Sequence, residues 1–542
     1  MLALFLIAVI AGMLLPLYTD EVGWRLHERA GFDGVDKMFT RICGPNTIAV
    51  PPFWMMPVRY YSYLFNGLFA DPFYVRVSGV LYALGWTALL LTLIRRIADD
   101  PVHRAVLALL TIGLMSQGVM PLLLVWSRPE QPIILGLTAA MVLGLRRTES
   151  ATPASMAWLR ALAVAALALI ALSYHIKAVF VIPIMLACLF FAARGPQALA
   201  PRIVAAGIIV IATVWGARYW VHRLDCPADA AAHAFIAQQN AGVELANAQG
   251  IDQILAFAAK ALGNVDLFTY LGMPVPRPSM MSSWLLDGRI DAGNAFGWFL
   301  ATLGLWLLVL ILAAACLFLA ARQSWRERRL DPRPLFAGLL VAAALGWSAT
   351  QAFRNVYEAS FVVPMVVLAV VLAIAPLCRD PLLFRRARLA SVVVGGLGMA
   401  SMVAVAVLFG PGLLRVAGQS GYVERQDFSV SPFGYSRIEP DILAAAKACS
   451  IPIDGNAILI DDVTYFALMR SHMPEHRQGL FEKKQYGEPP RTMFAPRQRD
   501  PIAYLRSIGS DGAVLSCDGF PPEYQSRVQR RGRFCCMGPP GW

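Results

Sequence analysis

Two adjacent carboxylates, Asp20 and Glu21, follow the first strongly apolar stretch of the chain, residues 1–17. A carboxylate held where a membrane-spanning helix leaves the bilayer is costly to keep near hydrocarbon, so its position indicates a functional site. Such a group can act as a general base and take a proton from an attacking hydroxyl. The alternative is that both residues are simply solvated where a hydrophobic segment ends.

Basic side chains form a second group of candidates, because Arg and Lys near membrane ends can hold an anionic group such as a phosphate. They are Arg59, Arg128, Lys177 and Arg354, with His175 as a further hydrogen-bond donor. Each also has a structural alternative. Arg128 can pair locally with Glu130, Lys177 can extend to the interface, and the other three can anchor a helix, satisfy a local hydrogen bond or cap a turn.

Residues that commonly bind metal ions do not cluster in the sequence. The histidines do not cluster and no CxxC pair occurs, so a zinc site has little support. Asp461 and Asp462 end a predicted strand, where carboxylates are common without chemistry. The Asp20–Glu21 pair could hold a divalent cation, although a base and basic residues suffice for the chemistry. No cofactor is assigned, and a divalent cation stays open.

Composition explains why these residues stand out. The 542 residues are 57% hydrophobic and only 15% charged, which excludes a soluble globule and indicates a polytopic membrane protein. Judged against the roughly 20 apolar residues that cross a bilayer, about eleven spans are predicted. They are residues 1–17, 74–94, 105–126, 131–145, 158–174, 178–193, 203–220, 294–320, 335–350, 360–377 and 389–413.

Loop charge sets the predicted orientation. With a cytoplasmic amino terminus, most Arg and Lys residues of the membrane part fall in inner loops, whereas the short outer loops hold only Arg128, Lys177 and Arg354. We therefore expect a multi-pass protein of the cell (inner) membrane whose carboxy-terminal part lies on the outer side. The net charge of +12 follows from this topology and requires no nucleic-acid partner.

Cysteine usage agrees with that topology. Six of the nine cysteines fall on the predicted outer side, an even number in a compartment where disulfides form. They are Cys43, Cys226, Cys449, Cys517, Cys535 and Cys536. Their pairing cannot be deduced from the sequence.

Two domains are predicted. Residues 1–413 form a transmembrane domain with outer loops at about 18–73 and 221–293, and residues 414–542 form a soluble domain. In the second domain, helices are expected at 438–449, 465–469 and 502–508, and strands at 456–461 and 512–517. The fold class is therefore mainly α, a polytopic helical membrane domain followed by a small α/β domain.

Several short motifs carry a family resemblance. They are Thr19-Asp20-Glu21 after the first span, Pro51-Pro52 in the first outer loop, Arg76 and Arg95-Arg96 at the ends of the second span, Ser127-Arg128-Pro129-Glu130, and the stretch from His175 through Lys177 to Pro183. In this layout the chain resembles the GT-C glycosyltransferases. Among these it looks most like the protein O-mannosyltransferase and lipid A aminoarabinose transferase group.

This resemblance implies transfer of a sugar from a polyprenyl-phosphate donor to a lipid, glycan or protein acceptor at the outer face of the membrane. Asp20 would be the general base of an inverting reaction, with Glu21 as a second choice or an orienting partner. The basic residues would stabilise the departing phosphate. The alternatives are a transporter or lipid-linked sugar flippase, a glycan ligase or polymerase, and a scaffold that displays the soluble domain.

Overall fold

The computed structural model describes most of the chain. The described residues are 1–22, 53–54, 71–98, 100–145, 152–193, 195–224, 250–272, 292–327, 331–350, 356–376, 381–418, 422–425, 428–471, 475–476 and 500–541. The chain forms two compact units. Unit 1 comprises Met1–Gly12, Ser78–Ala217 and Ile254–Gly412, and unit 2 comprises Met13–Val77, Arg218–Gln253 and Leu413–Trp542.

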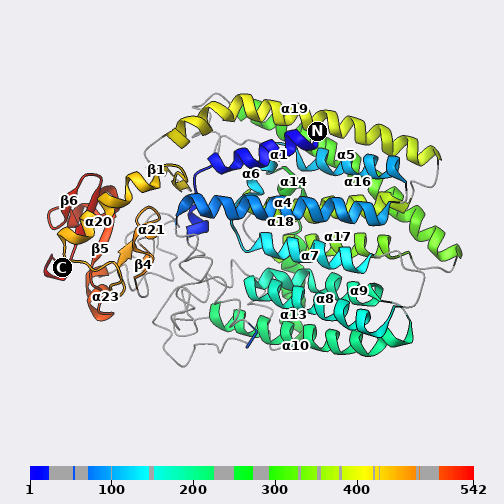
Figure 1. The fold of residues 1–542 in the computed structure, drawn as a ribbon, viewed down its shortest axis with the longest axis horizontal. Helices are drawn as coiled ribbons and strands as arrows, with labels where there is room; N and C mark the ends of the chain where they lie inside the picture. Colours follow the sequence, from blue (N-terminus) through cyan, green and yellow to red (C-terminus); the bar gives the residue numbers. More distant parts are fainter. Residues whose placement is uncertain are drawn as a thin grey trace. The chain divides into compact units, whose positions relative to one another are not determined.

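Unit 1 is built from helices, several of which run side by side (Figure 1). In chain order the described helices are α1 (Leu2–Ala11), α4 (Pro72–Ile97), α5 (Pro101–Met115), α6 (Met120–Leu123), α7 (Glu130–Gly144), α8 (Ala154–Tyr174), α9 (Ile182–Ala192), α10 (Leu199–Leu224), α13 (Ile251–Gly263), α14 (Leu267–Gly272), α16 (Ala292–Glu327), α17 (Pro332–Thr350), α18 (Ala359–Ile374) and α19 (Pro381–Gly418). Short 3-10 turns, η4 (Ile176–Phe180) and η7 (Val356–Glu358), precede α9 and α18.

Seven of the described helical segments are long and apolar enough to cross a membrane, and five shorter apolar helices accompany them. The chain is therefore a multi-pass membrane protein, but the predicted eleven spans are not confirmed. One reason is that a single apolar stretch of sequence can contain a turn that divides it into two helices. The predicted span 105–126 breaks after Met115, where Gly118 takes a φ of +54°, and α6 follows as a separate piece.

Helix α18 forms the centre of unit 1. All of its residues are buried, because the sequence from Ala359 to Ile374 is apolar on every side. It contacts α5, α7, α16 and α17, while α7, α8 and α9 contact one another. A helix that is apolar all round needs neighbours all round, and these helices supply them.

Unit 2 contains a five-stranded sheet of order β4-β3-β5-β7-β6. Its strands are β3 (Leu459–Ile460), β4 (Glu475–His476), β5 (Ala513–Ser516), β6 (Gln529–Arg531) and β7 (Phe534–Met537). The pairs β3–β4 and β3–β5 are parallel, and β5–β7 and β6–β7 are antiparallel. A separate antiparallel pair joins β1 (Tyr422–Arg425) to β2 (Phe428–Val430).

Helices pack on the two sides of this sheet. Helix α20 (Glu439–Ala448) and α21 (Tyr465–Leu468) bury their apolar residues in one core, and α23 (Pro501–Ser507) buries Ile502 and Leu505 in another. These three helices and strands β3 and β5 confirm the elements predicted for this part of the chain. Strands β6 and β7 were not predicted.

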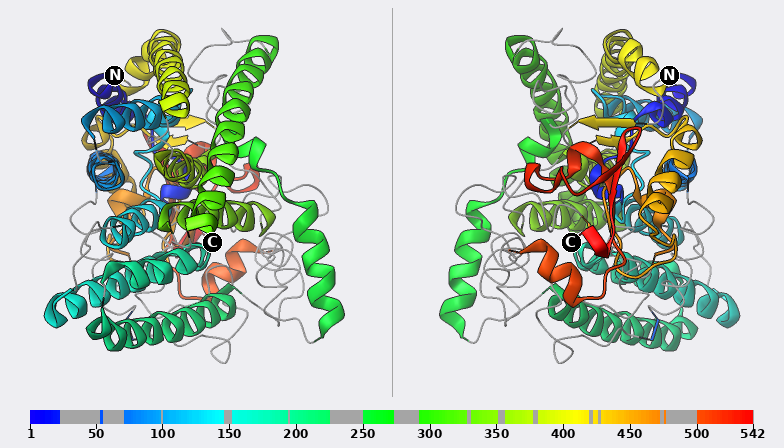
Figure 2. Two further views of the ribbon diagram at one scale, coloured as in Figure 1. Left: turned by 90° about the vertical axis from the view of Figure 1, so that its right-hand side faces the viewer. Right: turned by 90° about the vertical axis from the view of Figure 1, so that its left-hand side faces the viewer.

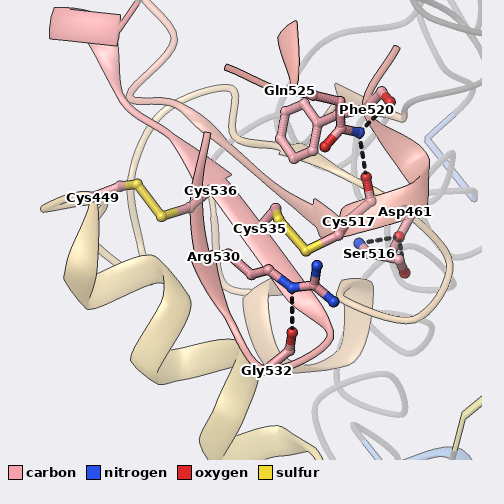
Figure 3. The surroundings of a disulfide bond; sticks show 10 residues. All are labelled: Cys449, Asp461, Ser516, Cys517, Phe520, Gln525, Arg530, Gly532, Cys535 and Cys536. Carbon is pink, nitrogen blue, oxygen red and sulfur yellow. Dashed lines mark hydrogen bonds between the residues drawn. A yellow bond between two sulfur atoms is a disulfide. The ribbon is translucent and has the colours of Figure 1, made fainter. Parts of the chain in front are cut away.

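Two disulfides cross-link unit 2 through neighbouring residues of β7 (Figure 3). Cys536 bonds to Cys449 after α20, and Cys535 bonds to Cys517 after β5. Successive residues of a strand point to opposite faces of the sheet, so the two bonds tie β7 down on both faces. Cys43 and Cys226 lie outside the described residues.

Close packing in unit 1 gives a first prediction. A Cβ at Gly79 in α4 would lie 1.8 Å from the Val125 carbonyl oxygen, whereas a Cβ at Gly85 in the same helix would meet only a Leu135 methyl at 3.6 Å. We expect Gly79→Ala to reduce the yield of folded protein and its midpoint of thermal unfolding, because the backbone at Val125 must move to make room for the methyl group. Gly85→Ala is the matched control, and similar melting of both variants would contradict the packing described.

Candidate functional site

The two predicted carboxylates differ sharply in their surroundings. Glu21 is fully buried and accepts hydrogen bonds from the Arg76 guanidinium at 2.7 Å and from the backbone N–H of Tyr18 at 2.8 Å. Arg76 is also fully buried, and its Nε donates to the Leu15 carbonyl at 3.0 Å. Arg76 at the start of α4 therefore holds the chain segment that follows α1.

Asp20 precedes this ion pair in a short helical segment and is half-buried. The segment is fixed from both sides, because Leu17 and Val22 are buried in the same hydrophobic core as Ile442 of α20. The Leu17 N–H also donates to the Val430 carbonyl at 2.9 Å. Unit 2 thus holds the backbone around Asp20 while part of its side chain stays accessible.

A buried group of charges lies in unit 1, and we call it the charge cluster: Arg128, Glu130, Lys177 and Glu358. The Lys177 ammonium contacts the Glu130 carboxylate directly, and Arg128 Nε lies 3.4 Å from the other Glu130 oxygen. Lys177 Nζ is also 4.0 Å from Glu358 Oε1. Two cations and two carboxylates balance formally, as burial of charge requires.

Aromatic side chains complete the cluster. The Tyr270 hydroxyl donates to Glu358 at 2.9 Å. Arg128 lies over the Tyr357 ring at 3.8 Å, and Lys177 lies over the Trp347 ring at 4.1 Å. Cation–π contacts of this kind stabilise a cation in a place with little water.

The members of the charge cluster share one position in the fold, because each lies at the end of a helix. Glu130 begins α7 and Arg128 precedes it. Lys177 lies in η4, between the end of α8 and the start of α9. Glu358 immediately precedes α18, and Trp347 lies in the last turn of α17. These ends meet through the contacts of Arg128, Glu130, Lys177, Glu358 and Trp347, so the charges gather where several helices of unit 1 begin or end.

The other residues predicted from the sequence lie in different places. His175 Nδ1 accepts the backbone N–H of Lys177 at 3.0 Å and so starts the η4 turn. Arg59 and Arg354 lie outside the described residues. The structure brings Arg128 and Lys177 together in unit 1, whereas Asp20 and Glu21 belong to unit 2.

Sequence reasoning missed part of the site. The sequence predicted Glu130 only as a local ion-pair partner of Arg128, and it did not single out Glu358, Tyr270 or Trp347. The signal shared by Glu130, Glu358 and Trp347 is an ionisable or aromatic residue at the end of an apolar stretch. Tyr270 gives no local signal, because its partner Glu358 is 88 residues away.

Metal binding finds no new support in the described part of the chain, where no group of three His, Cys, Asp or Glu side chains could hold an ion. Glu21 as placed is committed to Arg76. Asp461 is also committed, because its two oxygens accept hydrogen bonds from Val463, Thr464 and Ser516. Asp461 thus ties the end of β3 to β5 (Figure 3).

Comparisons with known proteins give limited results. No protein-family model matches the chain, and no curated protein matches its sequence. The chain is similar to the apo form of an oligosaccharyltransferase from Archaeoglobus fulgidus, with 12% identity and a TM-score of 0.40 over 97% of this chain and 71% of that one.

The chain is likewise similar to the oligosaccharyltransferase AglB from the same organism in complex with an inhibitory peptide and a dolichol-phosphate, with 12% identity and a TM-score of 0.39 over 97% and 70% of the two chains. A TM-score below 0.5 does not define a shared fold. The chemistry below therefore rests on the residues of this chain alone.

The Glu21–Arg76 pair yields a second prediction. Arg76→Met leaves the Glu21 carboxylate buried without its cation, so we expect a loss of about 3–5 kcal/mol in stability. Adding Glu21→Gln removes the stranded charge and should recover much of that loss. Thermal melting in detergent measures both, with Asp20→Asn as the neighbouring control that should melt like the wild type. Equal melting of Arg76→Met and the wild type would show that the pair is dispensable.

Proposed function

We propose that this protein is an integral-membrane glycosyltransferase. It moves a sugar from a polyprenyl-phosphate donor to a hydroxyl of a lipid, glycan or protein acceptor, with inversion at the anomeric carbon. The observation that supports the proposal is that Arg128 and Lys177 meet at Glu130 among helix ends of unit 1. We expect a lipid phosphate to lie at the level of such helix ends.

Asp20 is the general base in this proposal. Its side chain is half-buried on a backbone held by the hydrophobic core of unit 2, whereas Glu21 is tied to Arg76 and orients the segment. As the acceptor oxygen attacks the anomeric carbon, Asp20 takes the hydroxyl proton and the bond from that carbon to the phosphate oxygen breaks. Proton removal by a positioned carboxylate contributes typically 10²–10⁴-fold to such a step.

The charge cluster receives the leaving group. A polyprenyl phosphate departs with the bonding electrons, so positive charge aimed at its oxygens lowers the barrier without a general acid. Lys177 and Arg128 both contact Glu130. In this proposal the phosphate and the Glu130 carboxylate therefore compete for the same two cations, so Glu130 weakens phosphate binding.

The disulfides of unit 2 support the proposed side of the membrane. Two disulfides, Cys449–Cys536 and Cys517–Cys535, are expected only in an oxidising compartment. We therefore place unit 2 and its Asp20 segment outside the cytoplasm, which leaves the amino terminus cytoplasmic and the transfer at the outer face of a cell (inner) membrane.

A transfer assay with Asp20→Asn tests the proposal. Purified protein in lipid is given a panel of radiolabelled polyprenyl-phosphate sugars and a crude envelope fraction as acceptor. Wild type should move label to an acceptor, and Asp20→Asn should lose at least about 100-fold in rate while melting normally. Normal transfer by Asp20→Asn would remove it as the base. Movement of labelled carrier across the bilayer without transfer would instead identify a flippase.

Two substitutions in the charge cluster are expected to change the KM for the donor in opposite directions. Lys177→Met should raise the KM for the donor, because a phosphate contact is lost. Glu130→Gln should lower it, because the carboxylate that competes with the phosphate is neutralised. If the cluster only stabilises the fold, both variants will impair transfer in the same direction. Melting of each variant in detergent provides the control for folding.

A further inference from the structure

Helix α13 differs from the other helices of unit 1 because none of its residues is buried. Its large apolar side chains are strongly exposed, with Leu255 at 61% and Leu262 at 75%. Figure 2 shows the helix standing apart from its neighbours. Exposed apolar surface on this scale marks a contact that the described residues do not supply.

The sequence of α13 is amphipathic. Ile254, Leu255, Ala258 and Leu262 recur at the spacing of one helix face, while Ala256 and Lys260 lie on the other. At 1.5 Å per residue the helix is about 20 Å long, short of the ~30 Å of a bilayer core. An amphipathic helix with a charged face and one apolar face is typical of a segment that lies in the membrane interface.

By length and composition the segment Ile251–Gly272 is one of the seven candidate spans, but it consists of two helices, α13 and α14, separated by a break at residues 264–266. Asp266 interrupts the apolar run and caps α14 by accepting the Thr269 N–H at 3.0 Å. The Asp266 N–H in turn donates to the Ser348 hydroxyl at 2.9 Å. Ser348 lies two residues from the end of α17, so the carboxy-terminal end of α13 is held at the level where a spanning helix ends.

The next turn reaches the charge cluster. Tyr270 of α14 is fully buried and donates to Glu358, which lies beside Lys177. The helix that carries the exposed apolar face is therefore joined within a few residues to the buried charges, and both lie at the end of the spanning helices.

We propose that α13 is a membrane-interface helix whose Ile254, Leu255, Ala258 and Leu262 face binds lipid at the depth of the charge cluster. The bilayer is the partner because the helix is fixed to the end of α17 in a multi-pass protein. Its two described charges, Asp252 and Lys260, cancel, so burial of apolar area drives binding rather than attraction to anionic lipids. The inference does not depend on glycosyl transfer.

Nitroxide labels along α13 test the inference. A ketone-bearing amino acid placed at positions 254, 255, 258 and 262, and at 256 and 260 as matched controls, accepts the label without involving cysteine. The full-length protein is studied in phosphatidylcholine–phosphatidylglycerol nanodiscs. Collision with oxygen reports lipid exposure, and collision with a water-soluble nickel chelate reports water exposure.

We expect the first four labels to be oxygen-accessible at a common depth of about 5–10 Å below the phosphates, and the two controls to be accessible to nickel. Depth that increases steadily from 254 to 262 would show a spanning helix and overturn the proposal. Water exposure at all six positions would overturn it too, and so would protection of all six from both reagents, which would indicate a protein partner.

Discussion

The cost of burying charge beside hydrocarbon governs how this protein is built. Each buried ionisable side chain described at the ends of its helices has a counter-ion or a carbonyl: Glu21 with Arg76, Glu130 with Arg128 and Lys177, and Arg160 with the Ala192 carbonyl. Pairs of this kind add little net stability, but loss of one partner is expensive. Their main effect is therefore on specificity: they constrain which helix ends lie next to each other, which apolar contacts alone do not.

The Glu21–Arg76 pair and the charge cluster have different structural roles. Glu21 and Arg76 join the segment after α1 to the start of α4, and the adjacent hydrophobic core extends that support to Asp20. The charge cluster in unit 1 instead gathers side chains from the start of α7, from η4 and from the residue before α18, and their formal charges balance. One arrangement fixes the backbone of a chain segment, whereas the other brings side chains from separate helices into contact.

Much of the fold could be predicted because the sequence pattern within each segment determines its secondary structure. The helices at 438–449 and 502–508 carry their own periodicity, and Asp500 caps the second by accepting the Ala503 N–H. The different roles of Asp20 and Glu21 could not be predicted, since they depend on Arg76, 55 residues from Glu21. Hydropathy also could not show the break after Met115, which depends on a Gly118 backbone turn.

The neighbouring cysteines of β7 impose an order of events on unit 2. Both covalent links, to Cys449 and to Cys517, wait for Cys535 and Cys536, so neither can close while those residues are still being delivered. Until then the core that holds Leu17 and Val22 lacks its cross-links. The segment from Leu17 to Val22 is thus supported by a core whose cross-links close only after β7, the most carboxy-terminal of the described strands, has been made.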